Sequence, residues 1–225
     1  MGLRGFPSAI PSLPMRVTEI FTSIQGESTF AGLPCTFVRL TGCPLRCAYC
    51  DTAYAFAGGT EMAVDQVVAQ VAAAGVALVE VTGGEPLAQR ETPALLARLL
   101  AAGHSVLLET SNCLPINAVP EGVHVILDLK SPGSGEVAAN RWENLELLDA
   151  RGEIKFVLTG RADFDWAVAT LEAHHLAGRW PLLFAPVFGA LDPAELAAWI
   201  LAARLPVRLQ LQLHKLVWGP ERTGV

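Results

Sequence analysis

The sequence has few charged residues and no long uncharged stretch. Charged side chains make up 17% of the 225 residues and hydrophobic ones 52%, a composition that excludes intrinsic disorder over most of the chain. A membrane-spanning helix needs about 18–20 consecutive apolar residues. The richest run, 64–81, is interrupted by Asp65, Gln66, Gln70 and Glu80. We therefore expect a folded core and no membrane partner.

The chain also lacks an excess of basic residues and an export signal. Sixteen Lys and Arg against 22 Asp and Glu give a formal net charge of −6, which argues against binding to nucleic acid or anionic lipid. Residues 1–14 hold three prolines and no apolar run of the length that a secretory signal requires. The sequence thus predicts a cytoplasmic protein with an N-terminal extension over 1–16 and a single domain over 17–225, because that length fits one layered or barrel domain.

Short β-rich runs alternate with helical patterns from Cys35 to Leu213. This rhythm predicts a parallel sheet with crossover helices. The predicted strands are 36–40, 77–82, 105–109, 124–128, 153–158, 182–186 and 208–213, with 17–24 as a candidate edge strand. Apolar residues at helical spacing predict helices near 64–71, 92–100, 163–171 and 193–200. The expected fold is α/β: an open, partial (β/α) barrel of about six parallel strands, shorter than the eightfold version.

Four motif-like segments follow predicted strands directly. They are the cysteine loop after 36–40 and the segments 82–86, 109–112 and 130–133. In a barrel of parallel strands the chemistry gathers at the carboxyl ends of the strands. The sequence therefore predicts one functional site at that edge.

The chain has five cysteines, and three of them lie within eight residues. Cys43, Cys47 and Cys50 have the spacing C-x3-C-x2-C. Three thiolates on one short loop can hold an iron–sulfur cubane and leave its fourth iron open for a substrate. Zinc is the alternative, but a structural zinc site usually takes four ligands. The fourth would have to be Cys35, Cys113 or a histidine, and we interpret both cysteines as packing residues.

Two motifs together resemble a known superfamily. Tyr49 precedes the last cysteine of the loop, and Gly83-Gly84-Glu85-Pro86 ends the next strand. This combination is similar to that of the radical S-adenosylmethionine (SAM) enzymes. The resemblance implies that the open iron chelates the amino and carboxylate groups of SAM, and that one-electron reduction cleaves SAM to methionine and a 5′-deoxyadenosyl radical. The implied SAM-binding residues are Tyr49, Gly83, Gly84, Glu85, Ser111 and Ser131.

Four further segments narrow the resemblance. Residues 20–28, 37–43, 50–52 and 211–215 resemble the 7-carboxy-7-deazaguanine synthase (QueE) family, and the likeness extends from about Val17 to the end. It implies a lyase that converts 6-carboxy-5,6,7,8-tetrahydropterin to 7-carboxy-7-deazaguanine and ammonia by radical ring contraction. This step leads to 7-deazapurines such as queuosine, a modified nucleoside of tRNA.

The resemblance also implies roles for individual residues. Those that would contact the pterin are Gln25, Gly26, Glu27, Arg39 and His214. Thr52 would give an oxygen to a magnesium ion that also holds the substrate, with Asp51 beside it. No side chain is assigned to catalysis, because the radical forms on SAM. The implied partners are a flavodoxin or ferredoxin as electron donor and a second copy of the chain in a homodimer.

Simpler interpretations of these residues stay open at this point. Arg39 could pair with an acid on the barrel rim, and His214 could be a core histidine in a strand. Residues 25–27 could form only a turn, and Asp51 and Thr52 could cap a helix. Two other functions also compete: an activase of glycyl-radical enzymes, which would need a large protein partner, and a zinc-stabilised module without catalysis. Iron and zinc content would separate the last from the others.

Overall fold

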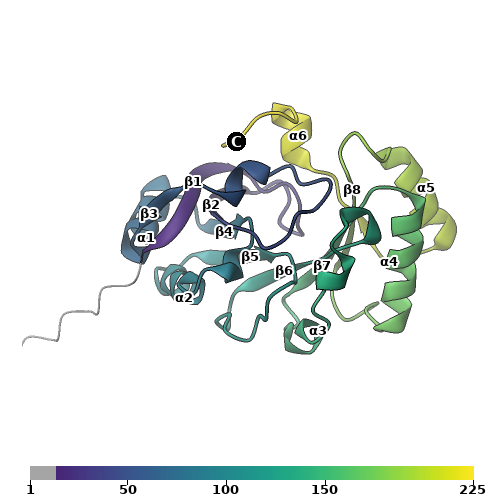
Figure 1. Ribbon diagram of the computed structural model, residues 1–225, viewed down its shortest axis with the longest axis horizontal. Helices are drawn as coiled ribbons and strands as arrows, with labels where there is room; N and C mark the ends of the chain where they lie inside the picture. The colour runs from purple at the N-terminus through teal and green to yellow at the C-terminus, as the bar shows by residue number, and fades with distance from the viewer. Residues whose placement is uncertain (1–13) are drawn as a thin grey trace, which may run out of the picture.

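One sheet of nine strands organises the chain in the computed structural model, which describes residues 14–225 (Figure 1). Most of the predicted extension over 1–16 lies outside the described residues, but Met15 and Arg16 belong to the first strand. The strands are β1 (Met15–Ile24), β2 (Pro34–Leu40), β3 (Thr60–Met62), β4 (Leu78–Gly83), β5 (Ser105–Thr110), β6 (His124–Leu129), β7 (Glu153–Leu158), β8 (Leu182–Pro186) and β9 (Arg208–Leu209).

The strand order is β3-β1-β2-β4-β5-β6-β7-β8-β9, and the sheet does not close. Strands from β2 to β9 in this order are parallel, whereas β1 pairs antiparallel with both β2 and β3. The expected open, partial barrel is confirmed. The 17–24 strand was wrongly expected at the edge, because β3 pairs with Met15–Val17 and takes that place.

The last predicted strand, 208–213, is also wrong beyond its second residue. β9 ends at Leu209, and a short helix begins at Leu213. The intervening chain leaves β8 because Leu213 N donates instead to Gly26 O, at 3.2 Å. The apolar residues of this segment suggested a strand, but a contact with the opposite end of the sheet determines its course.

The helices are α1 (Val64–Ala74), α2 (Thr92–Ala101), α3 (Asn144–Leu147), α4 (Arg161–Ala173), α5 (Pro193–Ala203) and α6 (Leu213–Trp218). The four predicted helices are present. α5 begins where its cap predicts, since Asp192 Oδ1 accepts from Ala194 N at 2.8 Å. α4 begins two residues before Asp163, and that carboxylate instead accepts from Gly133 N. Within residues 14–225, no helix is long and apolar enough to cross a membrane.

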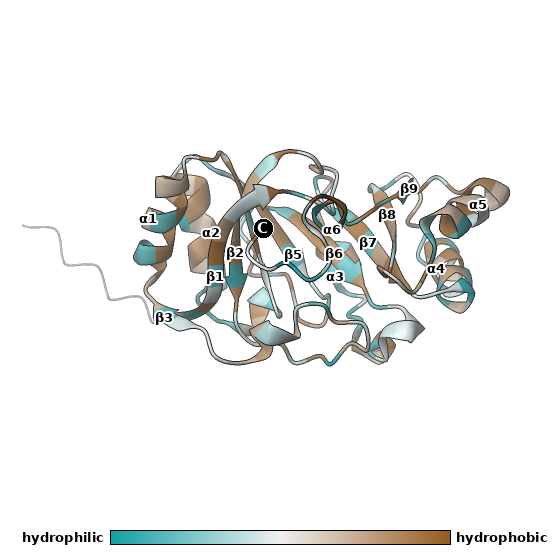
Figure 2. Ribbon diagram, turned by 90° about the horizontal axis from the view of Figure 1, so that it is seen from above, coloured by the Kyte–Doolittle hydropathy of each residue, from teal (hydrophilic) through white to brown (hydrophobic). Residues whose placement is uncertain are grey.

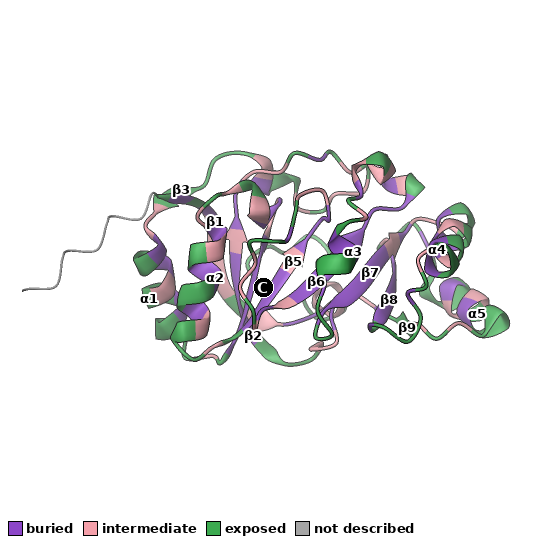
Figure 3. Ribbon diagram, turned by 90° about the horizontal axis from the view of Figure 1, so that it is seen from below, coloured by how far each residue is buried: buried purple, intermediate pink, exposed green. Residues whose placement is uncertain are grey.

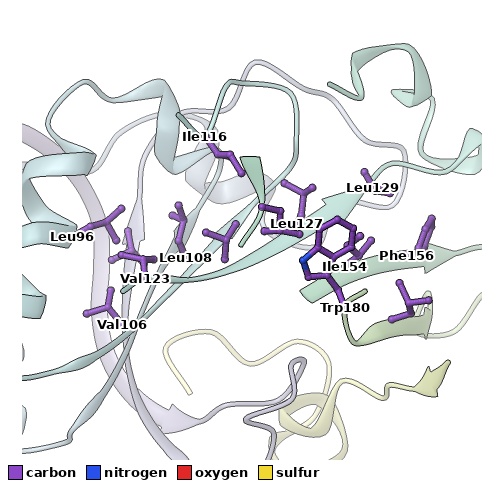
Figure 4. Packing of buried hydrophobic residues seen from close by; sticks show 14 of the residues in the cluster. Leu96, Val106, Leu108, Ile116, Val123, Leu127, Leu129, Ile154, Phe156 and Trp180 are labelled. Atoms are coloured by element: carbon purple, nitrogen blue, oxygen red, sulfur yellow. The ribbon is translucent and has the colours of Figure 1, made fainter. Parts of the chain in front are cut away.

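The outer face of the sheet is apolar and covered by helices. Strand side chains such as Val81, Leu108, Leu127 and Phe156 are fully buried there, and they form one continuous cluster with residues of α1, α2, α4 and α5 (Figure 4). Figure 3 shows the strands largely buried while the helices keep an exposed outer side. Most of the stabilising apolar burial therefore lies on this face.

The inner face begins apolar and becomes polar toward the carboxyl ends of the strands. A small cluster of Cys35, Phe37, Leu78, Leu107 and Ile126 lies at its base. Because side chains two residues apart on a strand share a face, the next inward residues are charged or polar: Glu80, Glu109 and Asp128. Figure 2 shows hydrophilic segments within strands that are otherwise hydrophobic.

Candidate active site

A cavity of about 400 Å³ opens at the carboxyl ends of the parallel strands. This size is in the range of small-molecule sites. Its wall includes residues of the loop after β2, of β4, β5, β6 and β7, and of the C-terminal segment that follows β9. α6 contacts β1, and Figure 1 shows it in yellow at the top of the view, away from α2 and α3. The predicted location of the site, at one edge of the barrel, matches this cavity.

The cysteine loop forms one wall of the cavity. Cys43, Cys47 and Cys50 are free thiols, and all three line it. The loop is held against the end of β4, because Gly84 N donates to Leu40 O at 3.1 Å and Glu85 N donates to Gly42 O at 2.8 Å. A Cβ on Gly84 would collide with the backbone of Gly42. The glycine pair thus brings the two motifs into contact.

The arrangement of the thiols fits a cluster better than a single metal ion. Among residues 14–225, no three His, Cys, Asp or Glu side chains converge as ligands of one ion. A cubane needs no such convergence, because each of its irons takes one thiolate. Burial raises the pKa of Cys43 and of Cys47, while the Lys130 ammonium acts in the opposite direction on both. That positive charge favours the thiolate form that an iron ligand requires.

Four of the six predicted SAM-binding residues line the cavity: Tyr49, Gly83, Gly84 and Ser111. Glu85 lies behind the wall and is fully buried. Its carboxylate accepts from Ser111 N at 2.7 Å and from Leu87 N at 2.9 Å. Ser131 is also buried and donates to Val157 O at 2.8 Å. Contacts of these residues with SAM stay predictions, and the positions of Glu85 and Ser131 favour a supporting role.

All five predicted pterin-binding residues line the same cavity. Gly26 lies against the C-terminal segment, where a Cβ would meet His214 Nδ1 at 2.8 Å. Glu27 Oε1 accepts from Gln212 Nε2 at 2.8 Å, and its Oε2 accepts from Lys155 Nζ at 2.8 Å. Burial opposes ionisation of Glu27, but Lys155 and then His214 hold its pKa below the usual value.

Gln25 and Arg39 are held by protein partners. Gln25 is 2% exposed, and its Oε1 accepts from the backbone N–H groups of Glu27 and Ser28, at 3.0 Å each. Arg39 Nε donates to Glu19 Oε1 at 2.8 Å, with the guanidinium near the ring of Tyr54. The rim ion pair considered for Arg39 is therefore present, and the same side chain still lines the cavity.

Asp51 and Thr52 connect the cysteine loop to the C-terminal helix. Thr52 Oγ1 donates to Asp51 Oδ1 at 2.9 Å, and Lys215 Nζ donates to Asp51 Oδ2 at 2.5 Å. Thr52 precedes the 3₁₀ turn Ala53–Phe56 but makes no capping bond with its side chain, so the helix-cap interpretation is wrong. Burial would raise the pKa of Asp51, but Lys215 lowers it to about 2.

The alternative considered for His214, a core histidine in a strand, is wrong, because His214 lies in α6 and not in a strand.

Comparisons with known proteins agree with this geometry. The family model described as "Radical SAM superfamily" matches residues 37–173. A 7-carboxy-7-deazaguanine synthase from Chlorobaculum tepidum is 48% identical over 215 residues, covering 94% of this chain and 98% of that protein. One from Koribacter versatilis is 46% identical, covering 94% and 100%. The chain belongs to the 7-carboxy-7-deazaguanine synthase family of radical SAM enzymes.

A solved structure shows the same fold. QueE from Escherichia coli superposes with a TM-score of 0.72, covering 88% of this chain and 94% of that one, at 24% identity. The relatives at 48% and 46% identity confirm the expected family. The relatives give no support to the activase or to the zinc module. Membership of the radical SAM superfamily implies a 4Fe-4S cluster and SAM, and the three cavity thiols are suitable ligands for that cluster.

Five charged residues on or directly after β4 to β7 line the cavity and had no role predicted from the sequence: Glu80, Glu109, Asp128, Lys130 and Lys155. Lys155 Nζ also pairs with Glu109, in addition to its bond with Glu27. Lys130 Nζ pairs with Asp128 Oδ2 at 2.7 Å, and Asp128 Oδ1 is buried without a hydrogen-bond partner among the described residues. The available signal was a charged residue inside an apolar strand, repeated in the four neighbouring strands β4, β5, β6 and β7, since such residues are rarely buried unpaired.

Proposed function

We propose that the protein converts 6-carboxy-5,6,7,8-tetrahydropterin to 7-carboxy-7-deazaguanine and ammonia. The observation that carries the proposal is the 48% identity to a protein of that name over nearly the full length of both chains. The cavity supports it, because the three thiols, the glycine pair and the predicted pterin-binding residues all line it. When bound, the cluster and SAM supply the carbon radical that removes hydrogen from the substrate.

In this proposal the chain's own residues orient the pterin. The guanidinium of Arg39 pairs with the substrate carboxylate, since its Nη groups are not used by Glu19. Glu27 accepts from the amino groups of the pyrimidine edge. Gln25 acts by fixing the turn, because both ends of its amide are already hydrogen-bonded to protein. Such orientation matters because the cofactor performs the abstraction and the protein selects the hydrogen.

A magnesium ion at Thr52 is part of the proposal. The donors there are hard oxygens, the type that Mg²⁺ prefers, and Mg²⁺ usually keeps waters and takes its other ligands from the substrate. Both oxygens of Asp51 are occupied by Thr52 and Lys215, so Thr52 is the freer ligand.

The electron donor, a flavodoxin or ferredoxin, and the homodimer belong to the proposal as well. The cytoplasmic location and the absence of a nucleic-acid partner stay predictions.

The test is an anaerobic assay after reconstitution with iron and sulfide. Protein, SAM, a low-potential reductant and the carboxytetrahydropterin are incubated with Mg²⁺ or with a chelator, and the products are identified by mass. We expect the loss of one ammonia per pterin, stimulated by Mg²⁺. Cleavage of SAM without any change in the pterin would refute this substrate and leave the superfamily assignment intact.

A further inference from the structure

Glu80 is a buried carboxyl group of β4 with one oxygen free toward the cavity. The residue is 2% exposed and lines the cavity. Its Oε2 accepts from Gln25 Nε2 at 2.9 Å. The orientation of that amide is fixed, since Gln25 Oε1 already accepts from two backbone N–H groups. Oε1 of Glu80 accepts no hydrogen bond from the part of the chain that the structure describes.

The charges around Glu80 do not balance. Glu109 of β5 and Glu27 of the turn after β1 both bond to the ammonium of Lys155 on β7, and Glu80 makes no such bond. Cys35 of β2 lies beneath as a buried thiol. Three carboxyl groups therefore lie near one ammonium group, that of Lys155, and only two of them are bonded to it. Because an uncompensated buried charge is costly, the group without an ion pair is the one expected to hold a proton.

The electrostatic surroundings of Glu80 also favour its protonated form. Burial and then the nearby Glu109 raise its pKa from 4.5 to about 8, although Gln25 and Lys155 act in the opposite direction. Glu27 adds a smaller rise, and burial also raises the pKa of the adjacent Cys35 thiol. Glu27 and Glu109 stay bonded to the ammonium and act as hydrogen-bond acceptors.

We propose that Glu80 is a neutral carboxylic acid at pH 7 and that its Oε1–H donates a hydrogen bond to an acceptor of the bound heterocycle. This inference rests on the proposed function. A 2-aminopyrimidinone edge carries acceptors, a carbonyl oxygen and a ring nitrogen, beside its amino donors. The ionised Glu27 and Glu109 can only accept, so a protonated Glu80 adds a neutral donor beside them. Glu80 thus selects for heterocycles with an acceptor at that position.

The first measurement concerns the protein without substrate. Infrared spectra of protein labelled with ¹³C-glutamate are compared between wild type, Glu80→Gln and, as control, the exposed Glu195→Gln. We expect the C=O band of a protonated carboxylic acid in wild type and in the control at pH 7, and its loss in Glu80→Gln. The band should also disappear from wild type as the pH rises through about 8. Absence of the band at pH 7 would overturn the proposal.

The second measurement is binding of the carboxytetrahydropterin, followed by isothermal titration calorimetry under anaerobic conditions. Glu80→Gln keeps a neutral donor and should bind within about threefold of wild type, whereas Glu80→Leu should bind about tenfold more weakly, the loss expected for one buried hydrogen bond. Wild-type binding should weaken between pH 7 and 9, and Glu80→Gln binding should not.

Three further outcomes have defined meanings. The same pH profile in wild type and Glu80→Gln would overturn the proposal, as would unchanged binding by a folded Glu80→Leu. Thermal melts establish that each variant is folded. If wild type binds no pterin, the proposed function and the donor role fail together, whereas the infrared band still decides whether Glu80 is neutral.

Discussion

The two faces of the sheet carry opposite chemistry although the same strands build both. Leu108 and Glu109 are neighbours on β5, and the first is packed beneath the helices while the second pairs with Lys155 in the cavity. Phe156 and Lys155 on β7 show the same contrast. The outer face gains free energy from apolar burial. The inner face contains charges that contribute little net stability and provide the site.

This contrast separates stability from activity within single strands. A substitution on the outer face should change the free energy of unfolding and leave the folded protein's chemistry intact. One at the cavity should do the reverse, except where it leaves a buried charge without its partner.

The largest effect is expected at the cysteine loop. Replacing Cys43, Cys47 or Cys50 with Ala should abolish turnover and cluster retention, because each thiolate holds one iron. Iron content and the visible absorption of the reconstituted protein are the measurements. Cys113→Ala is the matched control, since Cys113 lies outside the cavity lining, and loss of the cluster in this variant would refute the three-ligand assignment.

On the outer face, Phe156→Ala should lower the free energy of unfolding by about 3–5 kcal/mol. Phe156 is fully buried and contacts the rings of Phe184 and Trp166 edge-on, so its removal leaves a cavity. Urea titration of the metal-free protein measures the loss. A change below about 1 kcal/mol would mean that the helices do not depend on this packing.

At the cavity, Lys155→Met removes the ammonium between Glu27 and Glu109. We expect a loss of about 2 kcal/mol at neutral pH, less than for a fully enclosed pair because Glu27 is partly exposed. In wild type, the lowered pKa of Glu27 stabilises the fold above pH 4.5 and this contribution is lost on acidification. Between pH 5 and pH 8 the raised pKa of Glu80 makes the stability of both proteins fall as pH rises, and the variant should fall more steeply, because Glu27 and Glu109 ionise there without their counter-charge. Thermal melts at pH 5 and pH 8 test this.

The smallest effect is expected for Lys215→Met. Asp51 is 47% exposed in its side chain, and exposed ion pairs contribute about 0–1 kcal/mol. Since the pKa of Asp51 is held at about 2, below its usual 3.8, the pair should persist until the pH falls through that range. Faster hydrogen exchange in α6, with unchanged exchange in β5, would show that Lys215 anchors the helix. Unchanged exchange in α6 would show that it does not.

The sequence predicted the sheet well because its strands are short apolar runs between clear turn and cap signals. The bounds of β7 and β8 are those expected. The cysteine loop and the glycine pair were also identified, since both motifs are local. Residues whose role depends on distant contacts were not. Glu80 was interpreted as a break in a hydrophobic run, because nothing local shows that Glu27, Glu109 and Lys155 converge on it.

The C-terminal segment was mispredicted for the same reason. Residues 208–213 have the composition of a strand, but Gln210 Nε2 and Leu213 N both donate to Gly26 O. A pattern within one segment contains no information about a partner 184 residues away.

That link between Gly26 and Gln210 affects the order in which the protein folds. Contacts between segments so distant in the chain form late, because closing a long loop costs entropy before any contact repays it. The parallel strands need only neighbours nearby in the chain and can pair first. The substrate cavity should therefore be completed in the last step of folding, when the C-terminal segment docks against the turn after β1.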